Sequence, residues 1–437
     1  MIMAMKESGI EWVGLIPDDW KIAKNNRLFN ISKQLVNENW KNTQLLSLTK
    51  SGIIEKNIND GGGKQPESFG TYQYVEKDDI VLCLFDIDVS AVFSDRSKYD
   101  GMISPAYRVM KCTDAILPVY AKWWFDAVNI GRYYLIYTKS LRKTIDADGF
   151  GNILTAVPPL SEQQAIADYL DETCSQIDEI IAEAKASIDE YKELKNAILF
   201  EVMSKGISKH VPMKYSGVDW LGNIPVDWNF MKVTYILDYN DVYPIGDGDH
   251  GMIKTDSYCS EGIPYIRVQN IGWGTPLILD NTVYISESDN EKIKNSQLKP
   301  NDILFVKTGA TIGKTAIIPK SLPISNTTSH VGKITISTEH NPRYVFYMLS
   351  SFIGYKQFWD IACMKATRPE LSINEIKQMK VLLPASRVEE DEIVAYLDKI
   401  LPDYDSLIAE KESLINDLEA YKKSRIYEVV TGKRRVV

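Results

Sequence analysis

The sequence predicts an α+β fold with a pseudo-two-fold internal repeat. Two α/β-type domains are separated by two long antiparallel helices that form an intramolecular coiled coil. Two repeated segments support this prediction. The phrase SGIEWVGLIPDDW (8–20) returns as SGVDWLGNIPVDW (216–228) with eight of thirteen positions identical, and residues 166–206 align without a gap on 393–433. Repetition on this scale indicates two copies of one structural unit, joined end to end.

The repeats also predict the domain boundaries. A chain of 437 residues is long enough for two or three domains. We expect the first repeat phrase and the first α/β domain in residues 1–157, and the second phrase and domain in residues 209–383. The first long helix is expected in residues 158–208 and the second in residues 384–437.

The two helical segments carry heptad patterns. Apolar residues at alternating steps of four and three form one seam on each helix, with lysines in a few polar positions. The first seam contains Leu170, Cys174, Ile177, Ile181, Ala184, Ile188, Tyr191, Lys195, Ile198 and Val202; the second contains Leu397, Leu401, Tyr404, Ile408, Lys411, Ile415, Leu418 and Lys422. Pro402 is expected to kink the second helix or to delay its start. Each helix could instead dimerise with another molecule, but equal lengths and single seams favour pairing within the chain.

Mixed α and β structure is predicted between the helices. Short runs rich in Ile, Val and Thr indicate strands at 80–85, 107–111, 263–271, 302–307 and 332–337. Aromatic-rich segments at 120–129 and 342–352 indicate helices. The cluster Trp123-Trp124-Phe125 is more typical of a core than of a stacking surface.

The charge is unevenly distributed along the chain. The net charge is −9, of which residues 158–208 carry −7 and residues 384–437 carry −3, whereas residues 21–157 carry +3 and residues 229–383 carry +1. A polyanionic ligand would therefore meet the α/β domains rather than the helices. Five scattered cysteines without a C-x-x-C pair fit a reducing cytoplasm, and no apolar run approaches the length of a membrane span, so no membrane association is expected.

Motifs for catalysis are weak. The segment GATIGKT (309–315) has one residue too few between its glycines for a phosphate loop, and NPRY (341–344) lacks the second proline of an amino-methyltransferase motif. Asp247, Asp249 and His250 in GDGDHG (246–251) could bind a metal, but a solvated turn is the simpler interpretation. We expect a non-catalytic chain with no catalytic residues, no metal site and no cofactor.

Several segments resemble the specificity subunit of type I restriction–modification enzymes. The resemblance is carried by both phrases ending in I-P-x-D-W, by PPLSEQQAIADYLD (158–171), GIPYIRVQNI (262–271), NDILFVKTGATIGK (301–314) and VVTGK (429–433). It implies two target-recognition domains that read the halves of an asymmetric, bipartite site in double-stranded DNA. It also implies that the helices bind two methyltransferase subunits, which are joined by motor-nuclease subunits. The second helix begins PASRVEEDEIVAYLD (384–398), which departs from the family pattern, so the second methyltransferase contact is expected to differ in detail.

Candidate DNA contacts follow from the side chains that read base edges or bind phosphate, chosen on segments beside strand ends. In the first domain they are Lys50, Lys64, Gln65, Ser104, Tyr107, Arg142 and Lys143. In the second domain they are Arg267, Gln269, Asn270, Lys307, Thr308, Thr311, Lys314, Thr328, Ser329, His330 and Arg368. The competing interpretation is an ordinary solvated side chain for each, or, for the aligned Arg142 and Arg368, a salt bridge to a helix start.

Two alternative functions also fit parts of this sequence. The chain could be a non-catalytic coiled-coil scaffold whose globular domains bind proteins, or a self-contained modifying enzyme. The second alternative lacks cofactor and catalytic motifs. Steep salt dependence of DNA binding would separate a DNA reader from a protein scaffold.

Overall fold

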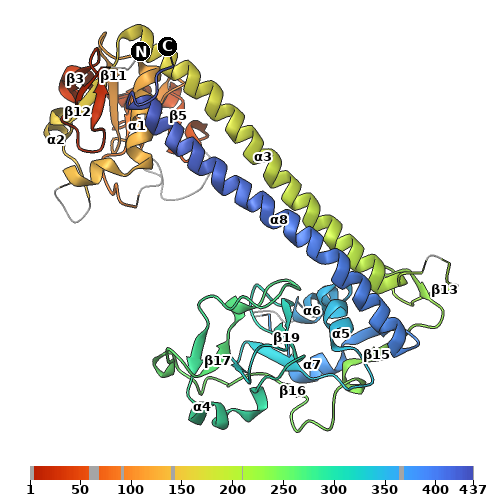
Figure 1. Ribbon diagram of the computed structural model, residues 1–437. Helices are drawn as coiled ribbons and strands as arrows, with labels where there is room; N and C mark the ends of the chain where they lie inside the picture. The colour runs from red at the N-terminus through yellow and green to blue at the C-terminus, as the bar shows by residue number, and fades with distance from the viewer. Residues whose placement is uncertain are drawn as a thin grey trace. The chain divides into compact units, whose positions relative to one another are not determined.

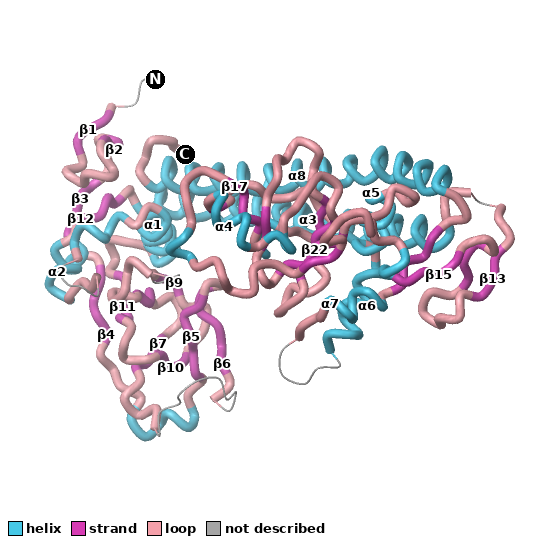
Figure 2. Tube along the Cα trace, turned by 90° about the horizontal axis from the view of Figure 1, so that it is seen from below, coloured by secondary structure: helices cyan, strands magenta, loops and turns pink. Residues whose placement is uncertain are grey.

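The structure, a computed structural model, describes residues 4–58, 68–89, 93–138, 143–208, 210–363 and 369–436. It divides into two compact units. The first module comprises residues 1–185 and 412–437, and the second module comprises residues 186–411. Both contain strands and helices, as Figure 1 and Figure 2 show. No helix within the described ranges is long and apolar enough to cross a membrane.

The two long helices, α3 (Leu160–Lys205) and α8 (Arg387–Val430), pack together in antiparallel directions (Figure 1). Lys422 of α8 pairs with Asp178 of α3 at 2.6 Å, and Lys195 of α3 pairs with Asp405 of α8. Seventeen residues forward along α3 thus correspond to seventeen residues back along α8. The predicted intramolecular pair is confirmed.

The seam predicted from the heptads is the packed face of each helix. Its apolar members are buried or half-buried on both helices, with Leu170 and Leu397 fully buried. Lys195 and Lys422, which occupy polar positions in the seam, reach an aspartate of the other helix. Pro402 lies inside α8, so it does not delay the start of this helix as one prediction had it.

The first module contains two four-stranded sheets and two short ribbons. One sheet has the order β6-β5-β10-β7 and the other β4-β11-β8-β9, while β1 pairs with β2 and β3 pairs with β12. The strands are β1 (Met5–Glu7), β2 (Leu15–Pro17), β3 (Lys21–Lys24), β4 (Phe29–Ser32), β5 (Leu45–Thr49), β6 (Gly52–Lys56), β7 (Gln73–Val75), β8 (Ile80–Leu82), β9 (Ser94–Arg96), β10 (Gly101–Ile103), β11 (Arg108–Cys112) and β12 (Leu154–Val157). The helices are α1 (Pro118–Ile130) and α2 (Ala147–Asn152), with 3-10 turns at η1 (Asn25–Arg27), η2 (Asn37–Asn42) and η3 (Tyr133–Tyr137).

The second module has two equivalent ribbons, but its sheets differ from those of the first module in strand order. The ribbons are β13 with β14 and β15 with β23, and the sheets have the orders β16-β22-β19-β20 and β18-β17-β21. The strands are β13 (Met213–Tyr215), β14 (Asn223–Pro225), β15 (Asn229–Lys232), β16 (Ile245–Gly246), β17 (Ile263–Ile266), β18 (Val283–Ile285), β19 (Ile303–Val306), β20 (Thr315–Ile317), β21 (Asn326–Thr327), β22 (Val331–Ile334) and β23 (Lys380–Leu383). The helices are α4 (Glu287–Lys292), α5 (Pro342–Ser350), α6 (Phe352–Cys363) and α7 (Ile373–Gln378), with 3-10 turns at η4 (Val233–Tyr235), η5 (Thr255–Ser257), η6 (Val268–Asn270) and η7 (Lys294–Ser296).

Equivalent hydrogen bonds frame both modules. The indole of Trp20 donates to Glu162 at 3.1 Å, and the indole of Trp228 donates to Glu389 at 2.9 Å. These bonds tie the repeat phrase of each module to the start of a long helix.

A second pair of equivalent bonds ties the first helix after the sheets to a strand. The Tyr120 hydroxyl donates to the Ala156 carbonyl at 2.9 Å, and the Tyr344 hydroxyl donates to the Leu382 carbonyl at 2.8 Å. The repeat seen in the sequence is therefore a repeat of three-dimensional contacts.

Large aromatic side chains form the core of the first module. Trp20, Trp124 and Phe125 are almost completely buried, as the Trp123-Trp124-Phe125 cluster predicted. The long helices end on this kind of core in both modules. Gly206 follows α3 and Gly432 follows α8, both at positive φ, where a Cβ would approach Trp228 and Trp20 respectively. Glycine at this position ends a helix without strain.

Candidate nucleic-acid interface

Loops at one edge of the four-stranded sheet of the second module gather many of the predicted contact residues. β19 and β22 are antiparallel with Val306 opposite Val331, and β19 and β20 are antiparallel with Phe305 opposite Thr315. The end of β19 and the starts of β20 and β22 therefore share one edge. We name residues 247–250, 267–270, 307–314, 328–330 and 369–371 the second loop edge.

The segment 267–270 joins this edge through parallel strands. β17 and β21 run parallel with Ile266 beside Thr327, so Arg267 and Thr328 follow at the same end. The Thr328 N–H donates to the Ile266 carbonyl at 3.3 Å. This arrangement brings together two predicted contact segments that lie about 60 residues apart in the sequence.

Thr308 and His330 form the central contact of the second loop edge. The Thr308 hydroxyl lies 2.7 Å from Nδ1 of His330, and the Lys307 N–H donates to the His330 carbonyl at 3.0 Å. The imidazole of His330 is exposed. The hydroxyl therefore fixes the ring through Nδ1 while the ring faces solvent.

Lys307 and Asn270 have internal roles. Lys307 is 6% exposed and lies between the carboxylates of Asp247 at 3.3 Å and Glu370 at 3.4 Å. Asn270 is fully buried, accepts from the Arg267 N–H at 2.9 Å and donates to the Ile278 carbonyl at 2.7 Å. Both side chains therefore brace the loops of this edge, and neither faces solvent.

Arg267 and Gln269 remain accessible to a ligand. Gln269 is exposed, and Arg267 is half-buried with Nη2 donating to the Asn281 carbonyl at 3.0 Å. Two buried polar atoms of this edge, Nε of Arg267 and Oγ1 of Thr328, have no hydrogen-bond partner among the described residues. Such atoms are uncommon in folded proteins.

Asp249 was missed as a structural element of the edge. The sequence favoured a solvated turn at 246–251, but Asp249 is 3% exposed and its two oxygens accept from the N–H groups of Ser329 at 2.9 Å and Ile253 at 2.8 Å. The carboxylate thus joins the 247–250 loop to the 328–330 loop. Gly248 permits this close approach, because it lies at positive φ and a Cβ there would be 2.0 Å from the Thr328 carbonyl oxygen.

Thr311 and Lys314 lie in the loop between β19 and β20. Both are half-buried. The ammonium of Lys314 lies 6.0 Å from the centre of the Trp273 ring. Lys314 therefore sits where it can contact both an aromatic ring and an anionic ligand.

The first module has an equivalent edge, formed by residues 83–87, 104–107 and 143–145, which we name the first loop edge. The Ile145 N–H donates to the Leu84 carbonyl at 2.9 Å, as the Leu371 N–H donates to the Lys307 carbonyl at 2.8 Å. These equivalent bonds attach a later segment to the end of β8 in one module and of β19 in the other.

Three of the predicted contacts lie on the first loop edge. Gln73 donates to the carbonyls of Ser104 at 3.3 Å and Tyr107 at 3.0 Å, and Lys143 is exposed at positive φ with its carbonyl accepting from the Ile87 N–H at 3.3 Å. Burial raises the pKa of the Tyr107 hydroxyl above its ordinary value. Lys50 is exposed in the turn between β5 and β6. Lys64, Gln65, Arg142 and Arg368 lie outside the described residues.

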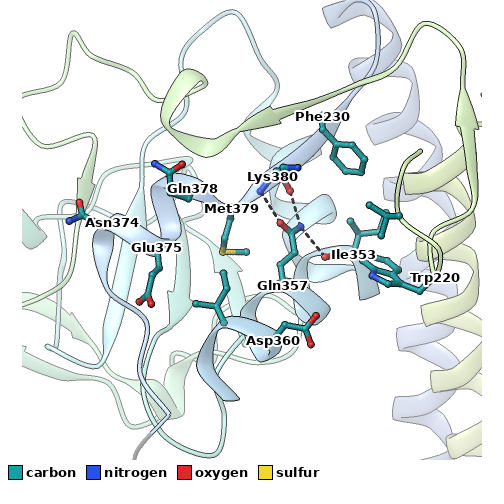
Figure 3. A pocket seen from close by; sticks show the side chains of 12 residues that line it. Trp220, Phe230, Ile353, Gln357, Asp360, Asn374, Glu375, Gln378, Met379 and Lys380 are labelled. Atoms are coloured by element: carbon teal, nitrogen blue, oxygen red, sulfur yellow. Dashed lines mark hydrogen bonds between the residues drawn. The ribbon is translucent and has the colours of Figure 1, made fainter. Parts of the chain in front are cut away.

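A pocket lies elsewhere in the second module, as Figure 3 shows. It measures about 610 Å³, is mostly apolar, and is lined by Trp220, Phe230 and Met379 among others. None of the described contact candidates lines it. Within the described ranges, no three His, Cys, Asp or Glu side chains are grouped as a metal site requires.

Comparisons with known proteins match this architecture. A family model described as type I restriction modification DNA specificity domain matches residues 225–420. The chain is 25% identical over 320 residues to the type I restriction enzyme MjaVIII specificity subunit of Methanocaldococcus jannaschii, covering 69% of this chain and 70% of that relative. It is 27% identical over 262 residues to the type I restriction enzyme EcoBI specificity subunit of Escherichia coli, covering 58% of this chain and about half, 52%, of that relative.

A solved structure has the same fold. It comes from work on complex assembly and conformational transition of the type I R-M system, and it matches with a TM-score of 0.70 at 14% identity, over 96% of this chain and 99% of that chain. The similarity confirms the predicted fold class.

Proposed function

We propose, from the premise that this chain is a relative of the specificity subunits of type I restriction–modification systems, that it reads an asymmetric bipartite site in double-stranded DNA. Each module reads one half of the site through its loop edge. One observation carries the proposal: both modules have the same arrangement of strand ends and loops, while the side chains on these loops differ. Two unlike edges on a repeated frame suit two unlike half-sites.

The second loop edge offers donors and acceptors that suit base edges and phosphates. Gln269, Ser329 and His330, held by Thr308, present polar groups of the kind that read bases in the major groove. Arg267 and Lys314 supply cations for a base or a phosphate.

The first loop edge offers a different set. Ser104, Tyr107 and Lys143 lie on it, and Lys50 lies in the turn after β5. Because its side chains differ from those of the second loop edge, its half-site should have a different sequence.

We further propose that the helices hold the partners that perform the chemistry. Two methyltransferase subunits would bind the outer faces of α3 and α8, and motor-nuclease subunits would join through them. Both helices carry apolar side chains that are about 40% exposed, among them Leu194 at 43% and Leu414 at 38%. A partner that covers these side chains would remove them from water.

Methylation-site mapping tests this function. Genomic DNA from a host that carries the whole system is expected to be methylated at one asymmetric sequence made of two unlike words with an unread gap between them. Replacing His330 with Ala should relax one word only, at a cost of about 1–3 kcal/mol in discrimination. A symmetric target, or equal loosening of both words, would contradict the assignment of one module to each half.

A protein-binding scaffold is the second candidate, favoured by the apolar pocket in Figure 3. Titration of the full-length chain with duplex DNA at several salt concentrations separates the two functions. A DNA reader loses affinity steeply as salt rises, because phosphate contacts release counterions. A scaffold would show no such binding.

A further inference from the structure

One aromatic side chain stands exposed beside the second loop edge. Trp273 is 53% exposed and follows the predicted contact segment 267–270 by three residues. It pairs as an isolated bridge with Thr315, and the Gly274 N–H donates to the Thr315 carbonyl at 3.2 Å. Since Thr315 begins β20, Trp273 lies at the same edge of the sheet as Thr308 and His330.

The indole is held from behind by other rings. Tyr355 meets it edge to face, with ring centres 5.6 Å apart, and Trp359 stacks on Tyr355 at 6.3 Å. Gly274 and Gly313 allow this close packing, because a Cβ on Gly274 would lie 2.8 Å from Ser350 and one on Gly313 would lie 3.3 Å from Tyr355. An exposed ring that is already ordered loses little conformational entropy when it binds a flat ligand.

The surroundings of Trp273 fit a nucleotide. A pocket of about 370 Å³ opens beside the ring, with Tyr355 and Phe352 as apolar walls and Thr315 among its polar groups. The Lys314 ammonium lies 6.0 Å from the ring centre. Aromatic faces beside a cation are the usual means of holding a base together with its phosphate.

We propose that Trp273 stacks on a nucleobase that is unstacked from its neighbour in the bound duplex, with Lys314 on the adjacent phosphate. This inference rests on the proposed function, since it requires the second loop edge to face DNA. Stacking uses the flat face that every base has, so the contact adds affinity without selecting sequence. It also places a local distortion of the duplex beside the half-site read by the second module.

Binding of a fluorescein-labelled duplex of mixed sequence by the full-length chain tests the proposal over a series of salt concentrations. Trp273→Ala should weaken binding about 5- to 150-fold at every salt concentration, with an unchanged slope of log affinity against log salt, because an uncharged contact is lost. Trp273→Phe should retain most of the affinity. Lys314→Ala should lower the magnitude of the slope by about one.

Tyr235→Ala is the matched control. Tyr235 is 70% exposed in the same module, and the nearby Leu237 pairs with Ile336 beyond the opposite end of β22, so DNA affinity should be unchanged in this variant. A duplex that carries the mapped target sequence, with 2-aminopurine at successive positions, should brighten at one step with the parent chain and not with Trp273→Ala.

Each remaining outcome overturns the proposal in a distinct way. Parent-like affinity in Trp273→Ala, or equal losses in the Ala and Phe variants, would remove the stacking contact while leaving DNA reading intact. Equal losses in Trp273→Ala and Tyr235→Ala would indicate general damage to the module instead of stacking. Failure of the parent chain to bind any duplex would remove the proposed function itself.

Discussion

The two modules share a frame and differ in what fills it. In the first module Asn25 accepts from the Thr155 hydroxyl at 2.7 Å and donates to the Phe150 carbonyl at 3.2 Å, all in the interior. The equivalent positions in the second module are Val233 and Val381, both fully buried. A polar pair and an apolar pair therefore support the same ribbon, so the frame constrains shape more tightly than chemistry.

A second difference lies on the repeat phrase. Trp12 of the first module stacks on Tyr133 with ring centres 4.2 Å apart, whereas its equivalent, Trp220, is 38% exposed beside the pocket in Figure 3. The chain covers one copy of this surface with its own η3 turn and leaves the other copy open. The repeated sequence thus gives both modules the same backbone at this position, but it does not determine what covers the surface.

The largest expected effect comes from the part that both modules share. Leu170→Asp and Leu397→Asp each place a charge in a fully buried seam position, and each should cost more than about 4 kcal/mol in the free energy of unfolding. Chemical denaturation followed by circular dichroism measures this loss. Glu193→Asp, at an exposed position of α3, serves as the control and should be silent. A small effect of either leucine change would contradict the packed seam.

The next effect separates the modules. Asp302 is fully buried with Lys333 at 3.5 Å, whereas Lys111 of the first module pairs with Glu76 at an exposed site. Lys333→Met should therefore cost about 3–5 kcal/mol, and Lys111→Met less than about 1 kcal/mol. Burial already raises the pKa of Asp302, and Lys333 opposes that rise. The cost of Lys333→Met in the free energy of unfolding should shrink as the pH falls and Asp302 becomes protonated. Thermal unfolding of the parent chain and the variant at pH 7 and pH 4 measures this change. Equal losses at both pH values would refute the prediction.

The buried polar pair gives a smaller effect. Thr155→Val leaves Asn25 with an unsatisfied acceptor and should cost about 1–3 kcal/mol. Adding Asn25→Val rebuilds the apolar pair that the second module uses and should recover most of the loss. Denaturant titration of the single and double variants measures the coupling. If the stability losses of the two single variants simply add in the double variant, the polar pair and the apolar pair are not interchangeable.

The variant with the smallest expected effect on stability should have the clearest effect on the discrimination between DNA sequences. Thr308→Val keeps the shape of the side chain but removes the hydroxyl that holds Nδ1 of His330. We expect weaker discrimination in one half-site by about 1 kcal/mol, with the other half-site unchanged. Methylation mapping in a host measures both words. Loss of discrimination in the half-site assigned to the first module would contradict the assignment of one loop edge to each half-site.

Local patterns predicted the frame. The heptads placed Leu170 and Leu397 in the seam because helix periodicity depends on near neighbours, and the aromatic cluster at 123–125 was correctly placed in the core. The strand predicted at 263–271 is shorter in the structure, ending at Ile266, because η6 begins at Val268.

The site was harder to predict, because access depends on distant segments. Lys307 is buried by Asp247 and Glu370, each about 60 residues away, and no local pattern reports that contact. Trp273 was overlooked although it stands between Gly272 and Gly274, a spacing that allows an exposed ring in a tight loop. Residue type marked the right loops, but the three-dimensional fold decided which side chains face outward.

The ion pairs across the long helices restrict how such a chain can change length. Asp178 with Lys422 and Lys195 with Asp405 follow one register, so a residue inserted into α3 alone would misalign every later partner on α8. An insertion in α3 must therefore be matched by an insertion in α8, and both must keep the apolar seam facing the other helix. Evolution of this part of the molecule is therefore expected to proceed by paired, phase-preserving steps.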